Sequence, residues 1–292
     1  MGSVELVKSV IHSMLAFTFH IYVWPSSLIK YLDGCISNFI WSGNTRTRKL
    51  VTVAWEIVST PIKVGGLGLR SLKHMNQAAL LKLAWDMISF EQEWALFCRN
   101  GFGKDKTMSK RYSKSSICLG IKPNWNIVMQ NALWLVGDGN KVNFWNDSWT
   151  GDALVELSIV HVSVQSSLVA KVSDFVLNIV WTIPKVIAEA FPNVVENIVQ
   201  LNTSSTQDMF IWQGTNYGIL SLKVAFNCIK PDMEDKNWCK LIWSDYIPPS
   251  KSFTTWRLFH HKMPTNENLQ KRGCHLTSMC SNCQSQNTAE YQ

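Results

Sequence analysis

The sequence lacks an apolar run long enough to cross a membrane. Its most apolar stretch, residues 10–24, is interrupted by His12 and His20 and followed by Pro25, whereas a spanning helix needs about 20 consecutive apolar residues. No small-residue cleavage site follows, and Glu5 lies where a secretory signal is basic. The 8 cysteines are too scattered for a disulfide scaffold and suit a reducing compartment. We therefore expect an intracellular protein, in the cytoplasm or nucleus, with no membrane partner.

Local motifs for catalysis are also missing. The chain has no adjacent Asp pair, no Gly-x-Ser-x-Gly turn and no His-Glu-x-x-His motif. The glycine-rich segment 65–68 matches neither phosphate-loop pattern, so we interpret it as a turn before a helix. The pair His260-His261 has no carboxylate at metal-site spacing and is interpreted as a surface or half-buried pair. The sequence therefore predicts no catalytic residue, no cofactor-binding residue and no small-molecule substrate.

Apolar and aromatic residues are abundant instead. Hydrophobic residues make up 46% of the chain, charged residues only 17%, and there are 14 Trp, a composition typical of a folded core. The length of 292 residues allows about two domains. The formal net charge of +7 permits a polyanionic partner such as RNA or DNA. The oligomeric state is left open.

Helical spacing dominates the first hundred residues. Two stripes at i, i+3 and i+4 spacing predict helices packed by these side chains, and Asn76 is expected to face water beside the second. The stripes are Leu6, Val10, Met14, Phe17 and Ile21, then Leu72, Met75, Ala79, Leu83 and Met87.

Two later segments predict β-hairpins. Alternating apolar residues at 134–136 and 141–145 flank a Gly/Asp/Asn turn. A second hairpin is expected to pair residues 210–212 with 219–220, followed by a helix capped by Ser221. The predicted fold is α-rich α+β, with N-terminal helices, a central β-hairpin and a C-terminal hairpin-plus-helices module.

Basic residues form three clusters that could contact phosphates, and Trp243, Trp256 and Phe259 could stack on bases beside the last. The alternative, a solvated surface over an aromatic core, stays open. The candidate nucleic-acid-binding residues are Arg46, Arg48, Lys49, Lys110, Arg111, Lys114, Arg257, Lys271 and Arg272.

One motif has metal-ligand spacing. Cys280 and Cys283 can supply two corners of a tetrahedral zinc site, and Cys274 and His275 are candidates for the others. The alternative is a pair of unliganded thiols. Because half a site cannot hold the ion firmly, the sequence favours an incomplete site without bound zinc.

Three stretches together resemble a known family. They are Phe39–Gly43 with Gly65–Arg70, Trp134–Trp149, and Trp238–Cys283. They are similar to the C-terminal portion of plant non-LTR (LINE-type) retrotransposon reverse transcriptases, often named ribonuclease H proteins. The third stretch resembles the reverse-transcriptase zinc-binding domain.

The resemblance implies a domain order. Residues 1–100 correspond to thumb-like helices after the polymerase palm, 101–205 to a basic connector and hairpin region, and 206–292 to a truncated zinc-binding-like domain. The family's zinc-binding domain continues with a His and a further Cys; Tyr291 stands where that His is expected. Only Cys280 and Cys283 carry over as ligand candidates.

The resemblance also implies a function. The polymerase motif Tyr/Phe-x-Asp-Asp would precede Met1 and the ribonuclease H carboxylates would follow Gln292. We therefore expect a non-catalytic reverse-transcriptase fragment with weak, non-specific RNA or DNA binding. Two alternatives stay open: a pseudogene-like product with no selected activity, at most a protein-interaction scaffold, or an accessory part of an RNA-directed DNA polymerase acting with another chain.

Overall fold

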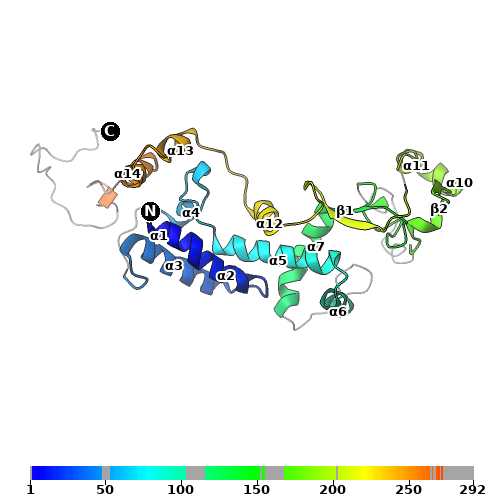
Figure 1. The fold of residues 1–292 in the computed structure, drawn as a ribbon, viewed down its shortest axis with the longest axis horizontal. Helices are drawn as coiled ribbons and strands as arrows, with labels where there is room; N and C mark the ends of the chain where they lie inside the picture. The colour runs from blue at the N-terminus through cyan, green and yellow to red at the C-terminus, as the bar shows by residue number, and fades with distance from the viewer. Residues whose placement is uncertain are drawn as a thin grey trace, which may run out of the picture. The chain divides into compact units, whose positions relative to one another are not determined.

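A computed structural model describes residues 2–47, 53–102, 116–151, 153–154, 168–201, 203–263, 265, 268–269 and 271 (Figure 1). The chain divides into two compact units, one drawn from residues 1–20, 24–77 and 228–292 and the other from residues 21–23 and 78–227. The division into units does not test the three regions predicted from the sequence, with boundaries near residues 100 and 205, and these stay a prediction. No helix in the described ranges is long and apolar enough to cross a membrane.

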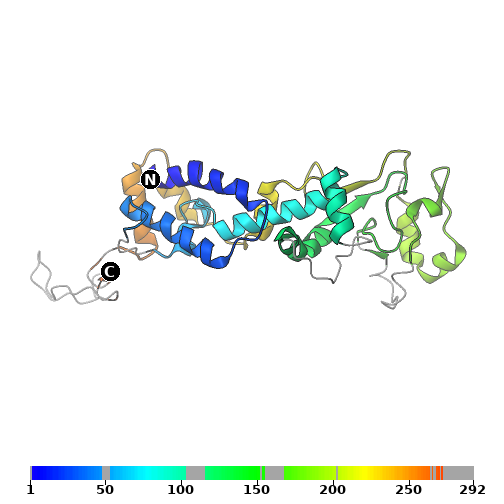
Figure 2. The same ribbon diagram turned by 90° about the horizontal axis from the view of Figure 1, so that it is seen from below.

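The first unit is helical. A π-turn, η1, joins α1 and α2 into one continuous rod, and α1 lies alongside α3 (Figures 1 and 2). Its elements are α1 (Gly2–Leu6), η1 (Val7–Ile11), α2 (His12–Phe19), α3 (Ser26–Ser42), α4 (Trp55–Val58), the 3₁₀ turn η2 (Ile62–Val64), the start of α5 (Leu72–Ser89), the end of α12 (Leu222–Ile229), α13 (Asn237–Ile242) and α14 (Pro249–Phe259).

The second unit mixes helices with short strands. Besides the remainders of α5 and α12, its elements are α6 (Glu93–Phe102), α7 (Ser116–Asn131), β1 (Ala132–Leu135), the 3₁₀ turn η3 (Val172–Phe175), β2 (Val176–Leu177), β3 (Val180–Trp181), α10 (Lys185–Ala190), α11 (Pro192–Val199) and β4 (Met209–Trp212). The described chain is therefore helix-rich α+β, as predicted, and its strands form two two-stranded sheets.

The predicted central hairpin is wrong in its pairing. β1 pairs antiparallel with β4, from Ala132 opposite Trp212 to Leu135 opposite Met209. Residues 142–144 bond elsewhere, because Phe144 N–H donates to Ala170 and Val172 N–H donates to Val142. The predicted second hairpin is wrong for the same reason: residues 210–212 form a strand, but their partner is β1 and not residues 219–220.

A hairpin that the sequence did not predict joins β2 to β3. Val176 pairs with Trp181 and Leu177 with Val180, leaving a two-residue loop. Both loop residues have positive φ, +49° at Asn178 and +66° at Ile179. This is the type I′ pattern, which favours Asn at the first position and Gly at the second. The β-branched Ile179 therefore occupies a strained position.

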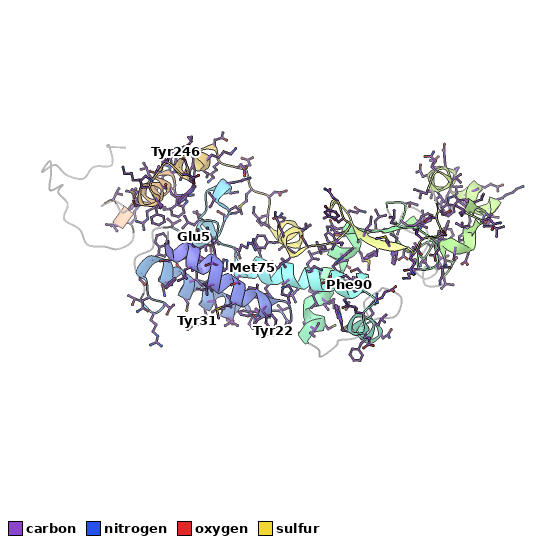
Figure 3. The ribbon with its side chains drawn as sticks, in the orientation of Figure 1. Glu5, Tyr22, Tyr31, Met75, Phe90 and Tyr246 are labelled. Carbon is purple, nitrogen blue, oxygen red and sulfur yellow. The ribbon has the colours of Figure 1, made fainter. Side chains whose placement is uncertain are left out.

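The apolar stripe of the first helices is not in the core. Its residues do share one face, but Met14 is 70% exposed and Phe17 is 78% exposed. The buried side instead carries Val7, His12 and Phe19. Because the rod is apolar on both sides, periodicity alone could not decide which side is buried. Aromatic side chains also project from the first unit at Tyr31 and Tyr246 (Figure 3).

Helix α5 begins as predicted, and Leu72, Met75, Ala79 and Met87 of its stripe are buried. Asn76, expected to face water, is only 3% exposed. Its Oδ1 accepts the Trp24 N–H at 3.0 Å and its Nδ2 donates to the Phe19 carbonyl at 3.1 Å. The buried amide thus satisfies backbone groups at the end of α2, which explains a polar residue in the core.

Candidate nucleic-acid interface

The glycine-rich segment is held by the C-terminal helix α14. The carbonyl oxygen of Gly65 accepts hydrogen bonds from Trp256 Nε1 and His260 Nε2, each at 2.7 Å. Gly65 has φ +108°, and a Cβ on Gly66 would lie 2.0 Å from the Thr60 carbonyl oxygen. Both positions therefore require glycine. The segment is a tight packing turn.

An aromatic stack lies between α13 and α14. The rings of Trp238 and Phe259 are 4.8 Å apart and nearly parallel, at 3°. Phe259 is 46% exposed, and Trp238 is half-buried. His260 packs edge-on against Trp238 at 5.5 Å and against Trp256 at 5.1 Å. The stack thus has a buried side anchored by His260 and Trp256 and an exposed edge at Phe259.

Two lysines carry positive charge near this stack and His260. The Lys236 ammonium lies 5.9 Å from the Trp238 ring. Burial lowers the pKa of His260, the bond to Gly65 opposes this, and the charges of Lys236 and Lys262 lower it further. His260 is therefore neutral near pH 7, with Nε2 as the donor to Gly65. Lys262 belongs to the third basic cluster of the sequence, whereas Lys236 and Trp238 were not predicted as site residues. The signal that could have found them is a lysine two positions before the first Trp of the third motif.

The predicted stacking aromatics separate in the structure. Trp256 is fully buried and belongs to the core. Trp243 is half-buried, and its indole N–H is enclosed without a hydrogen bond in the part of the chain described. Only Phe259 presents a large exposed ring, so it is the one of the three that a base could reach.

Arg257 points its charge at aromatic rings. Its guanidinium lies 5.0 Å from the ring centroids of both Trp41 and Phe253, and burial lowers the pKa of Arg257. The cation–π contacts stabilise the junction between α3 and α14. Its predicted phosphate contact stays a prediction.

The other predicted residues are at the surface or outside the described ranges. Arg46 and Lys271 are exposed. Arg48, Lys49, Lys110, Arg111, Lys114 and Arg272 lie outside the described residues, as do Cys274, His275, Cys280 and Cys283. Within the described ranges, no group of three or more His, Cys, Asp or Glu could hold a metal ion.

The second motif, Trp134–Trp149, contains a turn whose backbone is held by Asp208. The buried carboxylate of Asp208 accepts backbone N–H bonds from Gly137 at 2.7 Å, Gly139 at 2.9 Å and Lys141 at 2.8 Å. A Cβ on Gly137 would lie 2.1 Å from the Thr206 carbonyl oxygen. Sequence reasoning missed Asp208, because it lies about 70 positions from the turn that it holds and no local pattern marks it.

The remaining residues of this motif, 143–149, form hydrogen bonds with one another. Asp147 Oδ2 accepts the Asn143 N–H at 2.7 Å, and Asn143 Oδ1 accepts the Trp145 N–H at 2.9 Å. Trp149 Nε1 donates to the Phe144 carbonyl at 3.0 Å, and both of these rings are buried. Asp147 therefore has a structural role that accounts for its place in the motif.

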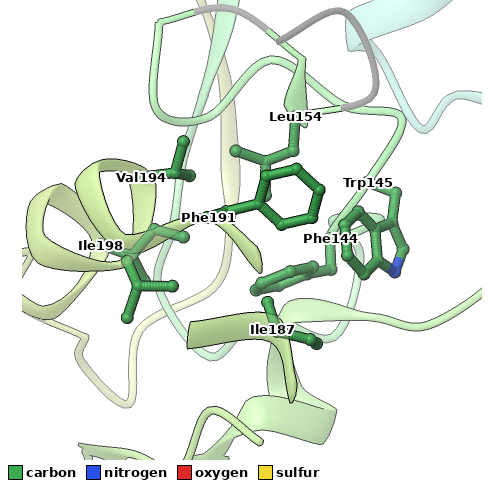
Figure 4. Close-up of a pocket in the computed structure, with 8 residues that line it drawn as sticks. Phe144, Trp145, Leu154, Ile187, Phe191, Val194 and Ile198 are labelled. Carbon is green, nitrogen blue, oxygen red and sulfur yellow. The ribbon is translucent and has the colours of Figure 1, made fainter. Parts of the chain in front are cut away.

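A small apolar pocket lies next to Phe144 and Trp145 of the second motif (Figure 4). Aromatic and aliphatic side chains line it, from the second motif, from Leu154, from α10 and α11 and from the junction between these two helices. They are Phe144, Trp145, Leu154, Ile187, Phe191, Val194, Val195 and Ile198. Apart from the indole N–H of Trp145, these side chains carry no polar group, so the pocket offers little to orient a polar substrate.

Comparisons with known proteins found a family model and relatives with similar sequences. The family model described as zinc-binding in reverse transcriptase matches residues 220–291. An Arabidopsis thaliana protein named "Putative ribonuclease H protein" is 22% identical over 300 residues, covering 97% of this chain and 48% of that protein. An "Uncharacterized mitochondrial protein" of the same plant is 28% identical over 139 residues, covering 43% of this chain and 84% of that protein.

The chain thus spans about half the length of the first of these relatives. No solved structure matches it. The resemblance to plant retrotransposon reverse-transcriptase proteins is confirmed by the family match and by a relative that aligns with nearly the whole chain.

Proposed function

We propose that this chain, similar to plant retrotransposon reverse-transcriptase proteins, binds single-stranded RNA or DNA without sequence preference and does not itself catalyse polymerisation. The observation that carries the proposal is the Trp238–Phe259 stack with Lys236 beside it. An exposed aromatic edge next to cations is the arrangement that sequence-tolerant single-strand binders use.

Two forces would act at this surface. A base stacking on Phe259 contributes about 1–3 kcal/mol in known single-strand binders. Lys236 and Lys262 would neutralise backbone phosphates and release counterions, so affinity should fall by about 0.7 log units per contact for each tenfold rise in salt. Duplex DNA, whose bases are already stacked on one another, should bind more weakly.

Fluorescence anisotropy with a labelled 12-nucleotide oligothymidylate tests the stack. Phe259→Ala should weaken binding about tenfold. The matched control is Leu258→Ala, which removes an apolar side chain, 60% exposed, from the adjacent position of α14 and should leave affinity unchanged. Equal losses in both variants, or a salt-independent affinity, would reject the proposed mode of binding.

The non-catalytic part of the proposal needs its own assay. Primer extension with Mg²⁺ or Mn²⁺ should give no nucleotide incorporation above the protein-free reaction. Incorporation that disappears on chelation would overturn this part while leaving nucleic-acid binding intact.

Zinc enters no step of the proposed binding. The family match implies a zinc ion, but no cluster within the described residues fits one. Cys280 and Cys283, outside those residues, would supply two of the ligands. Metal analysis of the purified protein should find less than one zinc per chain; one tightly held zinc would show that Cys274 or His275 completes the site.

A second candidate function is a protein-interaction scaffold. The exposed apolar face of α1, η1 and α2, with Met14 and Phe17 at its centre, favours it. Replacing both residues with Glu should abolish concentration-dependent association in sedimentation experiments while leaving oligothymidylate binding unchanged. A parent protein that stays monomeric and soluble at all concentrations would reject this candidate.

A further inference from the structure

Arg257 lies between two aromatic rings of the first unit. Its guanidinium carbon is 5.0 Å from the ring centroid of Trp41, on α3, and 5.0 Å from that of Phe253, one turn earlier on α14. The two rings are 5.5 Å apart, with 39° between their planes. The three side chains therefore meet at the junction of the two helices, with the cation in contact with both rings.

This cluster is anchored to the core. Phe253 stacks on Trp256 at 5.5 Å and 17°, and Trp256 is fully buried and bonded to Gly65. Trp41 and Phe253 are both half-buried, and the indole N–H of Trp41 is enclosed. Closely packed rings have little room to move, so the arginine beside them is held in one orientation.

The guanidinium of Arg257 has no acceptor among the described residues. It carries five N–H donors, yet it makes no hydrogen bond or ion pair with any of those residues, and its Nε is enclosed without a partner. Burial alone lowers the pKa of Arg257, so within the same residues no carboxylate offsets its charge. The side chain as a whole is half-buried; it is therefore enclosed at Nε and accessible elsewhere.

We propose that Arg257, held between Trp41 and Phe253, binds a backbone phosphate of single-stranded RNA or DNA. A phosphate accepts charge-assisted bonds, and the planar guanidinium can donate two of them in parallel. Because the rings already fix the guanidinium, binding costs little side-chain entropy. This inference rests on the proposed function, and it adds a phosphate contact and the two residues that position it.

The phosphate site is separate from the base-stacking surface. Arg257 and Phe259 are two positions apart on α14. A helix turns about 100° per residue, so their side chains leave α14 on roughly opposite sides. The phosphate contact and the stack can therefore be tested with separate variants.

The salt dependence of oligothymidylate binding tests the phosphate contact. In anisotropy titrations, Arg257→Gln should weaken binding about tenfold and make the slope shallower by about 0.7 log units per tenfold change in salt. Lys251→Gln removes an exposed charge from the same helix and is the control, which should change affinity less than about twofold. A slope that Arg257→Gln leaves unchanged overturns the inference.

A second variant guards against damage to the fold. Arg257→Lys keeps the charge and a cation–π contact but loses the planar fork, so affinity should fall about threefold while the salt slope is retained. Circular dichroism checks that each variant is folded at the temperature of the titration. Parent-like affinity in Arg257→Lys would overturn the role of the fork.

Trp41→Leu tests the positioning role of the rings. It should weaken binding about threefold in the parent chain and have almost no effect when Arg257→Gln is already present, because the ring then has no guanidinium to position. A ring with a merely structural role would cost the same in both backgrounds. Equal losses therefore overturn the positioning role.

The same titrations separate this inference from the proposed stack. If Phe259→Ala abolishes binding while Arg257→Gln changes neither affinity nor slope, the inference fails and the stack stands. If Arg257→Gln weakens binding and Phe259→Ala does not, the stack fails and the phosphate contact stands. A parent protein that does not bind oligothymidylate at low salt rejects both.

Discussion

Trp256 donates its indole N–H to the carbonyl oxygen of Gly65, 191 positions earlier in the chain. This bond joins the first and third of the stretches that resemble reverse transcriptases. The cation–π contact between Arg257 and Trp41 joins the same two stretches. Two motifs far apart in the sequence therefore pack against each other. This packing accounts for the glycine, tryptophan and arginine residues in them without a catalytic role for either motif.

The first prediction concerns this bond. Trp256→Phe keeps a buried ring but removes the donor and some volume, so the free energy of unfolding should fall by about 2 kcal/mol. Denaturant unfolding followed by circular dichroism measures it. Trp94→Phe is the control, because Trp94 donates to Gln92 at the surface; it should cost less than about 0.5 kcal/mol. Equal costs would mean that the bond to Gly65 contributes nothing special.

The second prediction concerns Asp208. In Asp208→Asn one acceptor oxygen becomes an NH₂ group that faces backbone N–H donors, so the free energy of unfolding should fall by about 3 kcal/mol. Glu189→Gln, an exposed carboxylate of the same unit, serves as the control in the same denaturation measurement. A loss below about 1 kcal/mol would show that water replaces the carboxylate in holding the turn.

The third prediction is a stabilising change. Ile179→Gly relieves the positive φ of a β-branched residue in the β2–β3 turn and should raise stability by about 1 kcal/mol, or about 2–4 °C in melting temperature. Ile219 is similarly exposed at 59% and does not have positive φ. Ile219→Gly should therefore destabilise. A lower melting temperature for Ile179→Gly would contradict the turn assignment.

The fourth prediction is a pH dependence set by His12. Its pKa is about 4 in the folded chain and 6.5 in the unfolded chain, so only the unfolded chain takes up this proton as pH falls through that window. The stabilising contribution is complete above pH 6.5 and is lost progressively towards pH 4. Asp33 acts in the opposite sense, since burial raises its pKa to about 6.

Comparison with His12→Leu isolates the His12 contribution. Unfolding free energies measured from pH 7.5 to 5 should fall more steeply in the parent protein than in the variant, at low salt and without phosphate. Parallel pH profiles would show that His12 titrates alike in the folded and unfolded chains.

The positions of helices and strands were predicted better from the sequence than the pairing between strands. The buried stripe of α5 and the cap by Ser221, whose Oγ accepts the Val224 N–H at 3.2 Å, follow from local spacing and were correct. Strand residues at 134–135 and 210–212 were also found. Alternation identifies a strand but says nothing about its partner, and here β1 pairs with β4 while Asp208 accepts the backbone N–H groups of the turn that follows β1.

Burial and the site were harder to predict for a related reason. The first helices are apolar on both sides, and the buried side includes a histidine that no apolar pattern would select. The aromatic stack needed Trp238 and Phe259, 21 positions apart, to meet across two helices. Such meetings are decided by tertiary packing, which sequence spacing does not encode.

The enclosure of Trp256 has a consequence for dissecting the protein. Its ring is fully buried and its indole bonds to Gly65, whereas the family match begins only at residue 220. A recombinant segment cut to that match would leave a large indole bare and an N–H without its acceptor. We therefore expect a segment cut to the matched residues to be less stable than the whole chain, and truncations should retain the glycine turn near residue 65.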